Sequence, residues 1–467
     1  MGKVMRLLFS PSRLAVAIAL AVALWLACGP LASSHPQAAQ SGAVVLLTLV
    51  LWSTGALPPF LTSLIFFALV LIFGLAQPDL IFSGFGSAAV WLIVSGFIIG
   101  AAITTSGLGQ RLASVLAPLL SGSYAHLIAG LALAATLLGF VMPSSVGRAV
   151  VLIPVGMALA DRVGFRGGSN GRIGIAATLA LACNMPSFAV LTANIPNMIL
   201  AGASETLHGV GFGYTRYLAL HFPLLGILKM ALLVALVLLI FPDRIHAQAD
   251  HAAAPAEPLP DSRVQRRVGL ILLATLALWM TDSLHHINPA WIGIATAVIL
   301  LLPRIGVLAP KSFNASVDFG MVLFVAAALG LGALVNASGL GQIVGRSLQQ
   351  VLPLQAGHDA LNFFSLSLMS ALTGLVTTIP GVPTVLTPMA PELAAASGFS
   401  LPAVLMTQVI GFSTVLFPYQ VGPLIVAMQM SGEKLGHLLK ITLPLALLTF
   451  VLILPLDYLW WRLLGWI

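Results

Sequence analysis

Trp91–Gln110 reads WLIVSGFIIGAAITTSGLGQ, and Leu323–Gln342 reads LFVAAALGLGALVNASGLGQ. Both stretches are apolar, and both end in Ser-Gly-Leu-Gly-Gln, which begins at Ser106 in the first and at Ser338 in the second. An apolar run of roughly 18 or more residues is typical of a transmembrane helix. Two such runs with the same ending predict that the chain contains two copies of a membrane-embedded unit.

Three further segments recur in the same order. In all four pairs the second copy follows the first by 226 to 234 residues. Chance matches between apolar helices would not keep both the order and the spacing, so we interpret the chain as two repeats. The three pairs are Leu46–Leu57 with Ala274–Leu284, Pro143–Pro154 with Thr377–Pro388, and Ser187–Ile199 with Ser413–Ile425.

The composition indicates that lipid is the solvent. Of the 467 residues, 59% are hydrophobic and only 7% are charged. This charge is far too sparse to cover the surface of a water-soluble protein. The two cysteines, Cys28 and Cys183, lie in apolar stretches and predict no disulfide framework. The sequence therefore predicts an all-α polytopic membrane protein of the bacterial inner-membrane type.

The N-terminus resembles a secretory signal peptide, because Lys3, Arg6 and Arg13 precede an apolar run from Leu14 to Cys28. We expect this run to be an uncleaved first transmembrane helix. The predicted organisation is an N-terminal helix and loop over 1–41, a first repeat over 42–241, a polar cytoplasmic linker over 242–266 and a second repeat over 267–467.

The basic residues predict the orientation. Each repeat has an odd number of predicted spans, so the two copies would lie in opposite orientations. With the N-terminus in the cytoplasm, the outer side receives only Arg216, Arg346 and Arg462. This bias follows the positive-inside rule and explains the net charge of +7 without nucleic acid. The predicted cytoplasmic side receives Lys3, Arg6, Arg13, Arg111, Arg162, Arg166, Arg172, Arg244, Arg263, Arg266, Arg267, Arg304, Lys311, Lys434 and Lys440.

Each repeat contains two polar interruptions at matching places. We expect helical hairpins over 124–160 and 360–397, with halves too short to span separately and therefore re-entrant, and broken helices over 172–206 and 402–430. Helix ends inside a membrane expose unpaired backbone groups, which suit a small anion. The candidate substrate-binding residues at these interruptions are Ser144, Ser145, Arg148, Asn194, Pro196, Asn197, Thr377, Thr378, Gly381, Thr384, Gln420 and Pro423.

Arg148 is the most distinctive of these residues. It lies one turn beyond the first hairpin tip and keeps its charge, so burying it unpaired would be costly. We expect an anion to face it, either the substrate or a structural carboxylate. Lys229, in the long helix that ends the first repeat, is expected to snorkel towards the membrane surface.

These features predict a secondary transporter of small anions, such as di- or tricarboxylates, sulfonates or sulfate-like ions, and no catalysis. A cation/proton antiporter or an oxyanion efflux permease is the alternative. An intramembrane enzyme is a more remote one, since the sequence shows neither a paired nucleophile and base nor a nucleotide or metal motif. No cofactor is expected besides sodium or a proton as coupling ion.

The motifs resemble those of the divalent anion/sodium symporter family of the ion transporter superfamily. Trp52-Ser53-Thr54 and Trp279-Met280-Thr281-Asp282 are similar to that family's Trp-Met-Thr-Glu, and Asn194-Ile195-Pro196-Asn197-Met198-Ile199 is similar to its Thr-Pro-Pro-Asn-Leu-Ile. The resemblance extends over essentially the whole chain. It implies a homodimer that carries dicarboxylates, citrate or sulfate by an elevator motion, usually with sodium.

The chain departs from that family at both hairpin tips, which read Ser-Asn-Thr in the family. The matching positions here are Ser144-Ser145-Val146 and Thr378-Ile379-Pro380. Ser144, Ser145 and Asn194 are the candidate sodium ligands that the resemblance carries over. The missing tip asparagines lead to a second hypothesis, in which Arg148 supplies the charge that sodium supplies elsewhere and transport is proton-coupled or uncoupled exchange.

Overall fold

The computed structural model describes residues 11–109, 111, 122–245 and 262–467. Within these ranges every regular element is a helix. Among the described residues, eight helices are long and apolar enough to cross a membrane, and Gly381–Ser397 with Leu401–Phe412 forms a further pair bent by 116°. The prediction of an all-α, multi-pass membrane protein is confirmed. Most of the predicted linker, 246–261, lies outside the described residues.

The first half of the chain contains the predicted hairpin and the predicted broken helix. Its broken helix is interrupted by the 3₁₀ turns Pro186–Ala189 and Leu191–Ala193, and a π-helical segment, Phe222–Leu228, joins its last two helices. Its helices are α2 (Pro11–Cys28), α3 (Pro30–Ser34), α4 (Pro36–Thr54), α5 (Pro59–Ile72), α6 (Pro78–Ile81), α7 (Ala88–Ser106), α9 (Tyr124–Val141), α10 (Ser145–Arg162), α11 (Asn170–Ala182), α12 (Ile195–His208), α13 (Tyr214–His221) and α14 (Lys229–Ile240).

The second half follows the same order of long helices. A π-helical segment, Thr449–Ile453, again lies inside its last long helix. Its helices are α15 (Ser262–Met280), α16 (Asp282–His285), α17 (Pro289–Leu301), α18 (Phe313–Ser316), α19 (Phe319–Ala337), α20 (Leu340–Val351), α21 (Asp359–Thr377), α22 (Gly381–Leu386), α23 (Ala390–Ser397), α24 (Leu401–Phe412), α25 (Gly422–Ser431), α26 (Leu439–Leu448) and α27 (Leu454–Leu463).

The two motif tryptophans make the same contact in their own halves. Trp52 on α4 donates from Nε1 to the carbonyl of Pro59, which begins α5, at 3.2 Å. Trp279 on α15 donates to the carbonyl of Pro289, which begins α17, at 3.0 Å. Each indole thus fixes the turn between two consecutive helices by pairing a carbonyl at the start of the second. The opposite orientation of the two halves stays a prediction.

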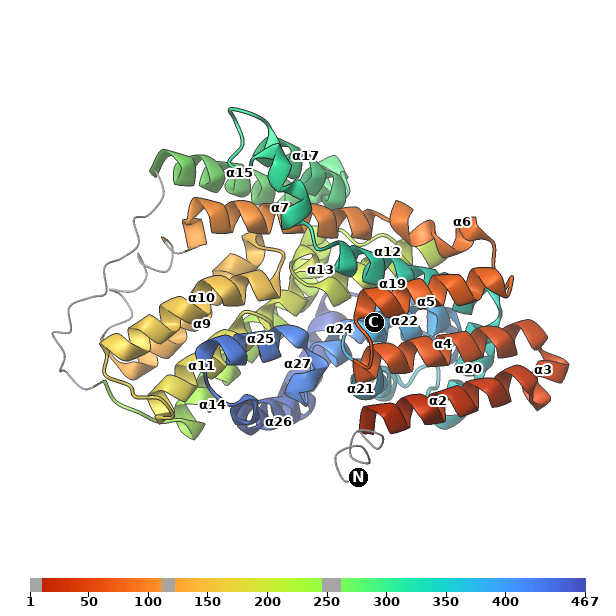
Figure 1. Ribbon diagram of the computed structural model, residues 1–467. Coiled ribbons are helices and arrows are strands. Elements are labelled where there is room, and N and C mark those ends of the chain that lie inside the picture. The colour runs from red at the N-terminus through yellow and green to blue at the C-terminus, as the bar shows by residue number, and fades with distance from the viewer. Residues whose placement is uncertain (1–10, 110, 112–121, 246–261) are drawn as a thin grey trace, which may run out of the picture.

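The halves interlock reciprocally (Figure 1). α7 packs against α17, and its counterpart α19 packs against α5. In the same way α25 packs along α10 and α11, while α12 packs against α22. Each half therefore places its broken helix against the hairpin of the other half, and the site between them belongs to both.

The hairpin arms correct one expectation. The arms α9 and α21 contain 18 and 19 residues, and both are long enough to cross a membrane. At about 1.5 Å per residue, an 18-residue arm extends about 27 Å, close to the hydrocarbon thickness. The argument that these arms are too short to span is therefore wrong, and re-entrance of the hairpins stays a prediction.

Candidate functional site

A cavity of about 660 Å³ opens where the two halves meet. It lies between one face of α7, the tip that joins α9 to α10, the start of α12, the start of α25 and the segment leading into α19. Four of the predicted substrate-binding residues line it, namely Ser144, Ser145, Asn194 and Pro423. Three of the four predicted interruptions thus contribute to a single chamber.

Besides α19, whose N-cap is Asp318, three helices begin at this cavity. Ser144 is the N-cap of α10, Asn194 is the N-cap of α12, and α25 begins at Gly422, beside Pro423. The first amides of a helix have no partner within it, and the helix dipole places partial positive charge there. Convergence of three such ends favours a bound anion. Asp318 is the one acidic residue among the described lining residues, and its carboxylate caps α19 by accepting from Met321 N at 3.0 Å.

Arg148 lies directly behind the hairpin tip and is fully buried. Its guanidinium donates to the carbonyl of Met142, at the end of α9, and to that of Cys183, at the end of α11, the latter at 2.7 and 2.9 Å. Weaker contacts reach the Ala193 carbonyl at 3.4 and 3.5 Å. We expected an anion or a carboxylate to face this side chain, but in the described structure its partners are helix-end carbonyls and a hydroxyl.

The hydroxyl partner of Arg148 is Ser145. Nη2 of Arg148 donates to Ser145 Oγ at 2.9 Å, and Ser145 itself lines the cavity. Because the serine oxygen accepts from the cation, its own O–H is left to donate elsewhere and is polarised by the charge behind it. Arg148 thus strengthens a hydroxyl donor at the cavity wall without lining the cavity.

The two asparagines of the first break have different roles. Asn194 Oδ1 accepts from Ile195 N at 3.0 Å, and its Nδ2 donates to Ser187 Oγ at 3.1 Å. Asn197 is fully buried and donates to the carbonyls of Ser187 and Val190 at 2.9 and 2.8 Å. Asn197 therefore holds the break together away from the cavity, and Pro196 is buried in the first turn of α12. Only Asn194 reaches the chamber.

The second hairpin tip is packed against the second break and does not line this cavity. Gln420 donates from Nε2 to the Gly374 carbonyl at 2.9 Å, while its Oε1 accepts from the amides of Leu416 and Phe417 at 2.9 and 2.8 Å. The Gln420 side chain thus joins tip and break as Arg148 does in the first half. The other predicted residues of this tip, which also lie outside the cavity, are Thr377, Thr378, Gly381 and Thr384.

Thr378 has an unusual backbone at that tip. Its φ is 66° and its ψ is 167°, a region that is normally open only to glycine. The neighbouring Thr377 hydroxyl donates to the carbonyls of Thr373 and Thr378 at 3.0 and 3.1 Å. A threonine held at this φ and ψ stores backbone strain at the second tip.

Sequence reasoning missed the wall that α7 contributes. Gly96, Gly100 and Thr104 recur every four residues and line the cavity, so they share one face of the helix. A Cβ at Gly96 would lie 3.0 Å from the Cβ of Pro143 at the hairpin tip. The spacing of these small residues was the signal that could have indicated a close contact on this face of α7. The sequence of an apolar helix does not indicate which other segment packs against it.

A second cavity, of about 500 Å³, lies at the other end of α7. It is lined by the start of α7, the end of α12 and the turn between α15 and α17. Met198 lines both cavities. On the predicted topology this second cavity opens to the outer side and the first to the cytoplasm, so Met198 lies at the partition between them.

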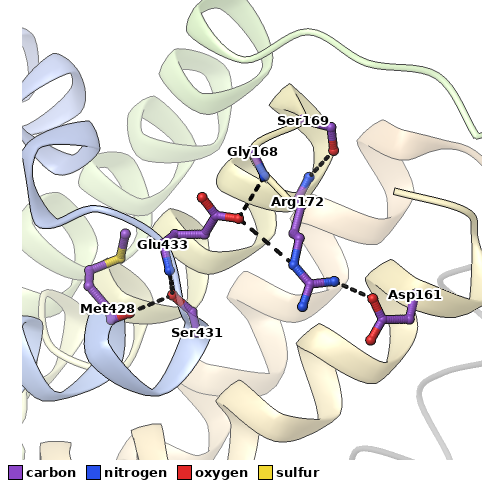
Figure 2. Close-up of polar contacts among 7 residues, drawn as sticks. All are labelled: Asp161, Gly168, Ser169, Arg172, Met428, Ser431 and Glu433. Carbon is purple, nitrogen blue, oxygen red and sulfur yellow. Dashed lines mark hydrogen bonds and ion pairs between the residues drawn. The ribbon is translucent and has the colours of Figure 1, made fainter. Parts of the chain in front are cut away.

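A polar network joins α10, α11 and α25 far from the hairpin tip (Figure 2). Arg172 on α11 forms an ion pair with Asp161 on α10 and lies 3.8 Å from Glu433, just beyond α25. Glu433 also accepts from Gly168 N at 3.1 Å. Since α25 comes from the second half, these contacts hold the first hairpin, the first broken helix and the end of the second as one unit.

Comparison with known proteins agrees with this architecture. A membrane protein of Cupriavidus necator is 26% identical over 397 residues, which cover 82% of this chain and 77% of that protein. An L-tartrate/succinate antiporter of Shigella dysenteriae is 24% identical over 359 residues, covering 73% of this chain and 72% of the antiporter.

A solved structure shares the fold. The crystal structure of the Alcanivorax borkumensis YdaH transporter superposes with a TM-score of 0.57 at 18% identity, covering 83% of this chain and 88% of that one. The matched family, the antiporter and the solved structure are all transporters, as the sequence predicted. The narrower resemblance to the divalent anion/sodium symporters stays a prediction. The family model of the citrate transporters matches residues 49–411, which is most of the chain. The protein therefore belongs to the citrate transporter family.

Proposed function

We propose that the protein exchanges small carboxylate anions across the bacterial inner membrane and binds them in the cavity between Ser144, Asn194 and Pro423. The observation that carries this proposal is the convergence of three helix N-termini on one chamber beside the Ser145 hydroxyl. Membership of the citrate transporter family and similarity to an L-tartrate/succinate antiporter support a di- or tricarboxylate as substrate.

Arg148 serves in this proposal as a resident cation. Its charge neutralises the carbonyl ends of α9 and α11, which would otherwise direct partial negative charge towards the hairpin tip. A transporter with a built-in charge at this place does not need a sodium ion there. We therefore favour sodium-independent exchange over sodium symport through Ser144, Ser145 and Asn194.

We further propose that the hairpin tip slides along α7 between the two cavities, which is an elevator motion. The contact of Gly96 with Pro143 and the small residues of this helix face support a sliding interface. Met198, which lines both cavities, would separate their contents at each stage. A homodimer is expected from the family resemblance and would anchor the static helices.

Counterflow in proteoliposomes tests the exchange. Vesicles loaded with succinate, malate, tartrate or citrate should take up the same labelled anion, and unloaded vesicles should not. Replacing external sodium with choline should leave the initial rate unchanged within about twofold, since one lost cation site would change binding tenfold or more. A rate that rose steeply with sodium would overturn the resident-cation proposal. Absence of counterflow with every carboxylate would overturn the substrate class.

A further inference from the structure

Two charged residues occupy equivalent positions in the last long helices of the two halves. Lys229 begins α14, directly after the π-helical segment Phe222–Leu228. Asp457 lies in the first turn of α27, which follows the π-helical segment Thr449–Ile453. They are 228 residues apart, within the spacing of the repeated motifs. Short π-helical segments inside α-helices are frequent at functional sites.

Both side chains are buried, and their contacts differ. Lys229 is 2% exposed and donates from Nζ to the Ser413 carbonyl at 2.8 Å, with Ser413 Oγ at 3.4 Å. The expectation that Lys229 snorkels is therefore wrong, because its ammonium is paired inside the protein. Asp457 is 0% exposed, and within the described ranges neither of its carboxyl oxygens has a hydrogen-bond partner.

The two groups interact electrostatically without forming a direct ion pair. Lys229 and the Trp461 indole both influence the Asp457 carboxyl group, yet the described part of the chain contains no Lys229–Asp457 contact within 4.0 Å. Among the described residues, the Trp461 indole is the one donor that faces the Asp457 carboxyl group, and it forms no hydrogen bond of good geometry with either oxygen. A buried carboxylate with no contacting cation and no well-formed hydrogen bond would cost several kcal/mol. The arrangement is therefore the one expected for a protonated Asp457.

Other titratable groups lie in the aromatic cluster around Trp461, one turn beyond Asp457 on α27. Tyr217 and His221 lie on α13 and Tyr458 on α27, while α21 contributes the apolar Phe363 against Trp461. His221 contacts the Met406 sulfur from Nε2 at 3.3 Å, and its ring faces Trp461 at 5.9 Å. The Tyr217 hydroxyl donates to the Phe188 carbonyl at 2.9 Å. Asp457 is the one acidic side chain in this described cluster.

Ser413 connects the cluster to the substrate cavity. It is the C-cap of α24, so Lys229 pairs with the negative end of that helix at the start of the second break. The other end of the break leads into α25, whose Pro423 lines the cavity. Breaking the hydrogen bond between Lys229 and Ser413 would therefore affect the second break, which leads to one wall of the substrate cavity.

We propose that Asp457 is a proton-binding site that controls the second break. When Asp457 releases its proton to water, the carboxylate attracts the Lys229 ammonium away from the Ser413 carbonyl, and the break is freed to rearrange. Proton uptake returns Lys229 to Ser413. The coupling part of this inference rests on the proposed transport function, whereas the proton site itself does not.

Infrared difference spectroscopy on the purified full-length protein tests the proton site without any transport. A pH titration should show the carbonyl band of a protonated carboxylic acid, and this band should be absent from Asp457→Asn. Asp79→Asn, a change at an exposed residue of α6, is the matched control and should keep the band. A wild-type spectrum identical to that of Asp457→Asn would overturn the proposal.

Flux driven by a pH gradient tests the coupling. In wild-type proteoliposomes a gradient of one unit should change net succinate flux by up to about tenfold, the limit for one proton. Asp457→Asn should keep counterflow and lose this response, and Asp79→Asn should retain it. Loss of the response in His221→Phe with retention in Asp457→Asn would assign the proton to the histidine and overturn the proposal. If no carboxylate is transported while the infrared band still titrates, the proposed function fails and the proton site stands.

Discussion

Arg148 and Ser145 lie one helical turn apart on α10, and the guanidinium donates to the serine hydroxyl at 2.9 Å. The arginine is fully buried, whereas the serine lines the cavity. The buried guanidinium therefore polarises a hydroxyl group that a substrate in the cavity can reach. The two residues should thus respond differently to substitution.

Replacing Arg148 should mainly affect stability. Arg148→Met removes the donors to the carbonyls of Met142 and Cys183 and leaves both buried without partners. Each such group costs about 1–3 kcal/mol, so we expect the protein to lose about 3 kcal/mol or more. A thermal unfolding scan in detergent measures the loss. Arg148→Lys should recover part of it, and an unchanged melting temperature in Arg148→Met would contradict the role assigned to this side chain.

The two tip serines should separate binding from stability. Ser145→Ala removes the polarised donor and should weaken substrate binding about tenfold, as expected for a charge-assisted hydrogen bond. Ser144→Ala removes the cap that accepts from Gly147 N at 3.0 Å and should lower stability by about 1 kcal/mol. Substrate-dependent thermal shifts report both quantities. Equal loss of affinity in the two variants would argue against a special role for Ser145.

The contact between α7 and the hairpin tip should tolerate no larger side chain. Gly96→Val places carbon atoms against Pro143, where a Cβ alone would already lie at 3.0 Å. We expect counterflow to fall below a tenth of the wild-type rate because the tip can neither pack nor slide. The matched control is Gly139→Ala, at a buried glycine of α9 whose added Cβ would meet nothing within 4 Å. Counterflow at the wild-type rate in Gly96→Val would contradict the sliding interface.

The network in Figure 2 predicts unequal effects for its two acids. The Glu433 side chain is 7% exposed and the Asp161 side chain is 65% exposed. Glu433→Ala removes a largely buried carboxylate that accepts from Gly168 N and lies 3.8 Å from Arg172, and it should destabilise by about 1–2 kcal/mol. Asp161→Ala removes only a solvent-screened pair and should cost less than about 1 kcal/mol. Thermal unfolding of both variants tests the order, and a larger loss in Asp161→Ala would refute it.

The predicted orientation can be tested by labelling. Arg166→Cys should react with a membrane-impermeant thiol reagent only in inverted vesicles, and Arg346→Cys only in intact cells. Both are charged loop or helix-surface positions on opposite predicted sides. A background that lacks Cys28 and Cys183 provides the control. Labelling of both positions from the same side would contradict the prediction that they lie on opposite sides of the membrane.

The sequence predicted the helices well because residues with strong preferences for helix ends lie between the apolar segments of each repeat. Ser169 and Ser400 cap α11 and α24, which begin within two residues of the expected starts of the two broken helices at 172 and 402. The predicted polar interruptions at Ser144–Ser145 and Asn194 line one cavity. Residues of these types favour helix ends and breaks through their local backbone preferences, so the interruptions can be predicted without knowing what packs around them.

The sequence could not predict which interrupted residues face inward. Gln420 and Asn197 look like substrate ligands in the sequence, but the amides of both are bonded to backbone groups. Asn197 pairs within its own break, and Gln420 pairs with its own break and with α21 of the second hairpin. Arg148 was expected to face an anion because burying its charge unpaired is costly, yet helix-end carbonyls supply the partial negative charge. Such pairing depends on where remote helices end, which local patterns do not encode.

The reciprocal packing of α25 on α10 and of α12 on α22 has a consequence for biogenesis. A nascent chain that has inserted its first half exposes surfaces on α10 and α11 whose partners have not yet been synthesised. Those surfaces stay uncovered until the ribosome has passed residue 431. Neither half is a complete folding unit, so a truncated product should be a ready target for membrane proteases.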